Sequence, residues 1–150
     1  MRYLNRVLLY SLMFFSVLTL SVNAQKAEHH KKSAALDGYC PVAYHVLNKA
    51  VKGKQKYSST YNKKTYDFVN AKAKKMFDKD PVKFLPKYDG YCATAMSMGK
   101  KLKSNPKLFT IYKMNTYLFS TKKAKMMFDK DPAMFVAKAN KEFIILNKKH

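Results

Sequence analysis

Met76–Pro81, which reads Met-Phe-Asp-Lys-Asp-Pro, recurs unchanged as Met127–Pro132, 51 residues later. Two further pairs of blocks recur in the same order: Asp37–Cys40 with Asp89–Cys92, and Thr65–Phe68 with Thr116–Phe119. Three matched blocks in one order indicate a tandem duplication of a unit of about 51 residues.

Each unit carries the pattern of a β-hairpin. Runs rich in tyrosine, threonine and phenylalanine are typical of strands, and a short polar stretch between two such runs predicts a turn. We expect strands at 56–61 and 65–69 in the first unit, and at 108–112 and 116–119 in the second. The apolar segments after each Gly-Tyr-Cys predict two short helices, at 41–47 and 93–98.

A lysine-rich amphipathic helix is predicted after each hairpin. Its N-caps are expected at Asn70 and Ser120, whose side-chain oxygens can accept hydrogen bonds from the first-turn N–H groups. The Asp-Pro pairs at 80–81 and 131–132 end these helices, and each proline begins another, the last over 132–146. The predicted fold class is α+β: two tandem hairpin-plus-helix units that share one core, because one unit alone is too small to be stable.

The N-terminal residues have the pattern of a secretion signal. Arg2 and Arg6 precede an apolar run over 7–22, and Ala24 supplies the small residue that cleavage requires. We expect a signal peptide at 1–24, a flexible leader at 25–35 and one domain at 36–150, with unit one at about 36–88 and unit two at about 89–146. A retained membrane anchor is the alternative, but the apolar run is shorter than the roughly 20 residues that span a bilayer. The chain is therefore predicted to be exported, either periplasmic or secreted, with no transmembrane segment after cleavage.

The chain is strongly basic. Its 30 Lys and Arg residues against 9 Asp and Glu give a formal net charge of +21, and both arginines lie in the predicted signal peptide. Arginine is the side chain that binds phosphates and bases in bidentate geometry, so we do not expect a nucleic-acid partner. Lysine faces fit either plain solvation or attraction to an anionic surface or an acidic protein.

Five segments together resemble the YHS domain family: Gly38–Tyr44, Val51–Lys54, Tyr61–Phe68, Phe77–Pro81 and Tyr88–Ala93. The chain is most similar to small exported YHS domain-containing proteins, in which a complete YHS unit precedes a diverged second one. The resemblance extends over roughly 36–140 and implies an association with metals. Other members carry cysteines after the second strand and one turn into the helix, whereas residues 69–73 here contain none, so a closed four-ligand zinc site is not expected.

Cys40, Cys92 and His45 are the candidate metal ligands, and Met96 and Met98 follow Cys92 closely in the sequence. Thiolate, imidazole and thioether groups together suit a soft ion, so copper or zinc is the expected cofactor. The predicted function is accordingly an exported binding domain for a soft metal ion or a metal-containing cofactor.

A disulfide between Cys40 and Cys92 is the alternative, because two cysteines in an exported chain commonly pair. Closing a loop of this length would contribute ~4 kcal/mol in the chain-entropy description. The function would then be that of a disulfide-stapled basic interaction domain, which binds an acidic partner or surface without metal. Two free buried thiols are the remaining possibility.

Catalytic patterns are weak in this sequence. It contains no Ser/His/Asp order, no His-Glu-x-x-His motif and no glycine loop of the kind that binds phosphate. A thiol enzyme, with a cysteine nucleophile and His45 as its base, is a third hypothesis. The sequence predicts a protein that is not an enzyme.

Overall fold

The computed structural model describes residues 34–148. The predicted signal peptide at 1–24 and all of the predicted leader except its last two residues lie outside the described residues. Within the described part, no helix is both long enough and apolar enough to cross a bilayer.

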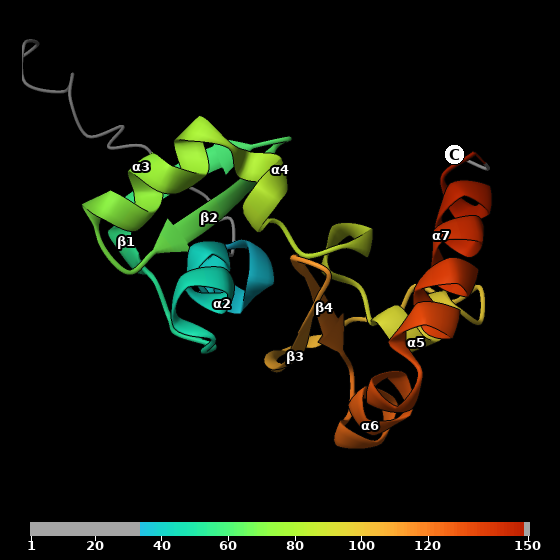
Figure 1. Cartoon of the computed structure of the whole chain (residues 1–150). Coiled ribbons are helices and arrows are strands. Elements are labelled where there is room, and N and C mark those ends of the chain that lie inside the picture. The colour runs from blue at the N-terminus through green and yellow to red at the C-terminus, as the bar shows by residue number, and fades with distance from the viewer. Residues whose placement is uncertain (1–33, 149–150) are drawn as a thin grey trace, which may run out of the picture. The chain divides into compact units, whose positions relative to one another are not determined.

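The two units contain the same elements in the same order: a 3-10 helix, a short helix, two strands and two further helices (Figure 1). Unit one contains η1 (Ala35–Gly38), α2 (Pro41–Leu47), β1 (Lys54–Tyr61), β2 (Lys64–Phe68), α3 (Ala71–Lys79) and α4 (Pro81–Phe84). Unit two contains η2 (Tyr88–Gly90), α5 (Ala93–Met96), β3 (Asn105–Tyr112), β4 (Asn115–Phe119), α6 (Lys122–Lys130) and α7 (Pro132–Lys148). The predicted α+β class, with two hairpins each followed by helices, is confirmed.

Each hairpin closes through a two-residue turn. Asn62 and Lys63 take positive φ angles of 47° and 61°, and Lys113 and Met114 take 46° and 60°. Two successive left-handed residues match the right-handed twist of antiparallel strands, which is why such turns favour hairpins. Both hairpins also contain a register shift at the same place, between Lys54 and Ser58 in the first and between Asn105 and Phe109 in the second. The turns are one residue shorter than expected, and the first strands begin two or three residues earlier, because pairing resumes beyond the irregularity.

Side-chain caps fix where the helices begin. Asn70 Oδ1 accepts a hydrogen bond from Ala73 N at 2.8 Å, which confirms the predicted cap of α3. The prediction for α6 is wrong by one residue, since Thr121 Oγ1 accepts from Ala124 N at 3.1 Å. Thr121, not Ser120, stands 51 residues after Asn70, and the Ser120 hydroxyl donates instead to Cys92 Sγ at 3.4 Å.

The Asp-Pro pairs end one helix and begin the next, as predicted. Asp80 Oδ1 accepts from Lys83 N at 3.2 Å, and Asp131 Oδ1 accepts from Met134 N at 3.0 Å. Each aspartate therefore caps the helix whose first residue is the following proline.

The two helices that follow these pairs differ in length. α4 ends at Phe84 because Leu85 precedes a proline, which disfavours the helical conformation, and Leu85 is extended with φ −71° and ψ 135°. After Pro132, α7 contains no further proline and continues to Lys148. Its Phe135 and Ala139 pack in the same buried cluster as Met96 of α5.

The buried side chains form three clusters, which corrects the prediction of a single shared core. One cluster lies in unit one around Phe68 and Phe77, and a second lies in unit two around Phe119 and Phe128. The third is small and joins Tyr39 and Tyr44 of unit one to Leu118 of unit two. Aromatic residues of each hairpin pack on the helix of their own unit, so few buried side chains remain for the contact between units.

Phe77 and Phe128 occupy equivalent places at the centres of their clusters. Phe77 is 1% exposed, with ring centroids 5.3 Å from Tyr66 and 4.9 Å from Phe68. Phe128 is fully buried, with ring centroids 5.1 Å from Tyr117 and 5.0 Å from Phe119. The predicted equivalence of these helix residues is confirmed.

Replacing either residue, as Phe77→Ala or Phe128→Ala, should lower the free energy of unfolding by about 3–5 kcal/mol, because each change leaves a cavity in a packed cluster. Urea denaturation followed by circular dichroism measures this loss. Met126→Ala is the control on α6, where the side chain is 64% exposed, and its effect should stay within about 0.5 kcal/mol. Equal effects of the three changes would contradict the assignment of the clusters.

Candidate functional site

The two cysteines lie in different clusters. Cys40 immediately precedes α2 and is fully buried in the unit-one cluster. Cys92 immediately precedes α5 and is fully buried in the unit-two cluster, where it accepts the Ser120 hydrogen bond. The two cysteines occupy equivalent positions in the two units. Each therefore packs in the core of its own unit.

The other predicted ligands are scattered as well. Met96 is buried one helical turn after Cys92, whereas Met98 is 56% exposed. His45 Nε2 lies 2.9 Å from Thr116 Oγ1 and makes that hydrogen bond instead of facing either cysteine. Among residues 34–148, no group of three or more His, Cys, Asp or Glu side chains lies close enough together to hold a metal ion. Cys40, Cys92 and His45 are therefore not brought together as one metal-binding group in the described part of the chain.

Both cysteines are free thiols in the structure. The structure therefore does not contain the disulfide of the alternative prediction. It has two free buried thiols, which was the third possibility. Cys40 packs in the unit-one cluster and Cys92 in the unit-two cluster, whereas a disulfide requires the two side chains to face each other at close range.

Two side-chain hydrogen bonds join the units at a junction that contains the predicted ligand His45. His45 reaches across it to Thr116, which is fully buried on β4. The His45 ring also packs edge-on against Phe84, with centroids 5.6 Å apart. Burial lowers the pKa of His45, and the positive charge of Lys83 lowers it further, so the imidazole is neutral at pH 7.

Tyr44 anchors the same junction from the neighbouring position on α2. Its hydroxyl donates to the Pro106 carbonyl at 2.8 Å, and its ring centroid lies 4.8 Å from that of Phe109. Tyr44 is completely buried, and burial raises the pKa of its phenol well above the usual range. The phenol therefore stays protonated and serves as a hydrogen-bond donor that holds the two units together.

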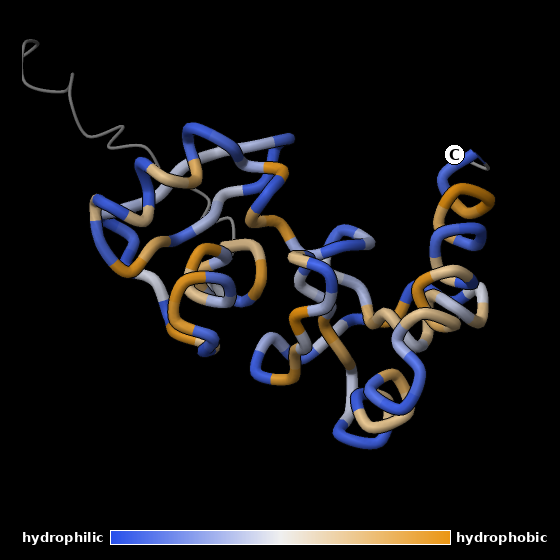
Figure 2. Tube along the Cα trace, viewed as in Figure 1, coloured by the Kyte–Doolittle hydropathy of each residue, from blue (hydrophilic) through white to orange (hydrophobic). Residues whose placement is uncertain are grey.

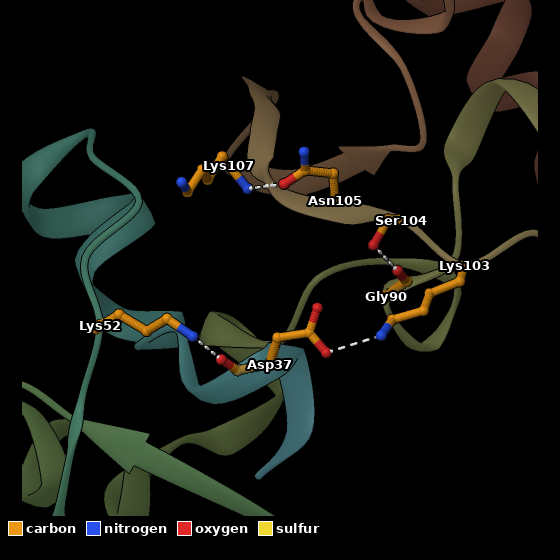
Figure 3. A network of polar contacts seen from close by, with 7 residues as sticks. All are labelled: Asp37, Lys52, Gly90, Lys103, Ser104, Asn105 and Lys107. Atoms are coloured by element: carbon orange, nitrogen blue, oxygen red, sulfur yellow. Dashed lines mark hydrogen bonds and ion pairs between the residues drawn. The ribbon is translucent and has the colours of Figure 1, made fainter. Parts of the chain in front are cut away.

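A second contact between the units meets at Asp37 (Figure 3). Lys103 Nζ lies 3.0 Å from Asp37 Oδ1, and Lys52 Nζ donates to the Asp37 carbonyl from the other side. Lys52 and Lys103 stand 51 residues apart at equivalent positions. Because the Lys103–Asp37 pair is exposed, it contributes little to stability by itself.

Sequence reasoning missed the role of Leu118. The blocks at 65–68 and 116–119 differ at one position, where the first has Asp67 and the second has Leu118. Asp67 is buried near Lys52; burial raises its pKa, and the lysine opposes that shift. Leu118 is fully buried against Tyr39 and Tyr44. This difference between Asp67 and Leu118 was the signal available in the sequence. It places an apolar residue where Tyr39 and Tyr44 of the other unit cover the strand.

An open cleft of about 730 Å³ lies beside His45 at the junction. Its unit-one wall is α2, which contributes Tyr44, His45 and Asn48. Its unit-two walls are residues 109–111 of β3 together with Lys125 and Asp129 of α6. Clefts of roughly 300–1,000 Å³ with a partly apolar lining and a few polar groups are typical of small-molecule sites. This arrangement can hold a ligand.

Comparison with known proteins gave no relatives: no family model matches the chain, and no curated protein or solved structure is significantly similar to it.

Both thiols should be unreactive in the folded protein and should titrate as two free thiols once the chain is unfolded without reductant. Ellman's reagent, added before and after denaturation, measures this count. The physical reason is the complete burial of Cys40 and Cys92. Recovery of thiols only after reduction would show that the protein contains the disulfide instead.

His45 should make stability fall as the pH drops below about 6.5. Its pKa is lowered in the folded state, so between the unfolded and folded pKa values the unfolded chain binds more protons, and protonation favours unfolding. Above pH 6.5 this effect is absent. Urea unfolding at pH 8 and pH 6 tests it: wild type should lose more stability than His45→Gln, which cannot titrate but can still hydrogen bond. Parallel losses in both proteins would contradict the assignment.

Proposed function

We propose that this chain is an exported basic binding domain, which holds an acidic protein partner through its lysines. The observation that carries the proposal is an imbalance between acidic and basic side chains in the structure. The secretion pattern at 1–24 supports the exported location, and the resemblance to exported YHS proteins supports a binding role rather than catalysis.

Most acidic side chains of the described residues make contacts inside the molecule. Asp78 binds Lys74 and the Ser59 hydroxyl, and these hydrogen bonds lower the pKa of its carboxyl. Asp80 and Asp131 cap helices, and Asp37 pairs with Lys103. These aspartates therefore interact with neighbouring groups of the same chain and do not pair with the other surface lysines.

Few lysines have an acidic partner. Within residues 34–148 there are three ion pairs, formed by Lys74, Lys103 and Lys125. Since the whole chain carries +21 formal charge, the remaining lysines give its surface a strongly positive field. Such a field attracts acidic partners and raises their association rate.

α3 presents the clearest stripe of these lysines. Lys72, Lys75 and Lys79 are exposed and stand three and four residues apart, so they lie along one face of the helix. Ala73 and Phe77 are buried on the opposite face, and the hydrophilic and hydrophobic residues alternate along this helix in Figure 2. We name Lys72, Lys75 and Lys79 the α3 lysine stripe.

A protein partner fits the stripe better than a lipid surface does. Helices that lie in membrane interfaces insert an apolar face below their lysines. In α3 that face is already buried against the unit-one hairpin through Phe77. The stripe can therefore form ion pairs with carboxylates but has no apolar face to insert.

Replacing the stripe, as Lys72→Gln, Lys75→Gln and Lys79→Gln together, should weaken binding to poly-L-glutamate by about tenfold at low salt. Each exposed ion pair contributes roughly 0.5 kcal/mol, and three such losses add to that factor. Isothermal titration calorimetry of the full chain measures the change, and added salt should reduce wild-type binding because it screens the charges.

The control is Lys100→Gln, Lys141→Gln and Lys148→Gln together, which removes the same charge from other exposed positions. It should weaken binding much less than the stripe variant. Loss of affinity that is equal in both variants would show diffuse attraction without a docking stripe. Tighter binding to phosphatidylserine vesicles than to poly-L-glutamate would overturn the choice of an acidic protein.

A further inference from the structure

We propose that the cleft at the junction of the two units binds a small, neutral, polyhydroxylated molecule such as a mono- or disaccharide. This site is separate from the α3 lysine stripe, and the inference does not depend on the proposed function. It rests on what the duplication places in the cleft, on the charge balance of the lining, and on the position of the apolar groups.

The cleft contains one of two equivalent polar triads. In unit two, Thr110 Oγ1 donates to Asp129 Oδ1 at 2.6 Å, and Lys125 pairs with the other carboxylate oxygen. In unit one the same arrangement is formed by Ser59, Asp78 and Lys74. All three members of the unit-two triad line the cleft, because α2 of unit one forms the opposite wall. The unit-one triad is no part of that lining, so the chain provides its own internal comparison.

The lining has no net charge. The Lys125 ammonium is matched by the Asp129 carboxylate, and both carboxylate oxygens already accept hydrogen bonds. His45 is neutral at pH 7. An organic anion or cation would therefore find no unmatched opposite charge here, whereas hydroxyl groups can both donate and accept. Neutral ligands with several hydroxyls match this mixture of donors and acceptors.

Polar and apolar groups come from different parts of the lining. Phe109 and Ile111 on β3 are partly buried and supply the apolar surface. The exposed amide of Asn48 and the ammonium of Lys125 supply hydrogen-bond donors from the two helices. A sugar ring has one face of C–H groups and a rim of hydroxyls, so it can cover the aromatic side chain while its rim meets the donors. The volume of about 730 Å³ suits one or two such rings.

Asn48 offers a substitution that removes a contact without strain. It ends α2 in the left-handed conformation, with φ 48° and ψ 39°, which glycine adopts freely. Asn48→Gly thus deletes the amide and keeps the backbone. Asn62, in the turn of the first hairpin, has nearly the same φ of 47° and does not line the cleft. Asn62→Gly is consequently a matched control.

The test is a titration of the full chain with glucose, N-acetylglucosamine and maltose, followed by amide chemical shifts in NMR. About 0.5 M salt screens charges beyond roughly 4 Å and so suppresses binding to lysines. At least one sugar should cause saturable shifts confined to residues 44–48, 109–111 and 125–129. Asn48→Gly and Lys125→Met should each weaken that binding about fivefold, while Asn62→Gly and Lys74→Met should leave it unchanged.

Benzoate and N-acetylalanine methylamide are the competing probes, since they represent organic anions and peptide groups. Tighter binding of either probe in the cleft would overturn the assignment to a polyhydroxylated ligand. Failure of all three sugars to give saturable shifts at up to ~100 mM, a hundred times a millimolar Kd, would overturn it as well. Equal effects of Asn48→Gly and Asn62→Gly would remove the cleft as the site.

Discussion

The contact of Tyr44 with Phe109 and the Pro106 carbonyl is the interaction on which the joined structure depends. A unit of about 51 residues has only a small core of its own, which rarely stabilises a fold by more than about 3–5 kcal/mol. Tyr44 belongs to unit one, yet Leu118 and Phe109 of unit two help to bury it completely, and its hydroxyl donates to the Pro106 carbonyl of unit two. The hydrogen bond of His45 and the burial of Leu118 both follow from this docking. The cleft exists for the same reason, since one unit supplies each wall.

Local patterns were enough to predict the hairpins and helices, because strand alternation, turn residues and Asp-Pro caps act within a few positions. The cap of α6 was misplaced by one residue, since serine at 120 and threonine at 121 are both suitable caps, and the 51-residue offset from Asn70, which points to Thr121, was not applied. The pairing of Tyr44 with a carbonyl 62 residues away has no local signal. Only the substitution of Leu118 for the aspartate of the other unit hinted at a covered position.

The candidate metal ligands show why residue types alone do not place a site. Cysteine, histidine and methionine suit a soft ion, but two units with the same order of elements place matching residues in matching environments. Cys40 and Cys92 each precede a short helix and lie in the core of their own unit. The repeat that made the two cysteines conspicuous in the sequence is therefore also the reason that they are apart in the structure.

The continuation of α7 beyond the length of α4 decides what covers α5 in unit two. Met96 is the counterpart of Tyr44, and where Tyr44 is covered by the following unit, Met96 is covered by Phe135 and Ala139 of α7. α7 thus packs on the face of α5 that corresponds to the face of α2 in contact with unit two. Within residues 34–148, the surface of α5 that matches the docking surface of α2 is therefore covered by a helix of the same unit.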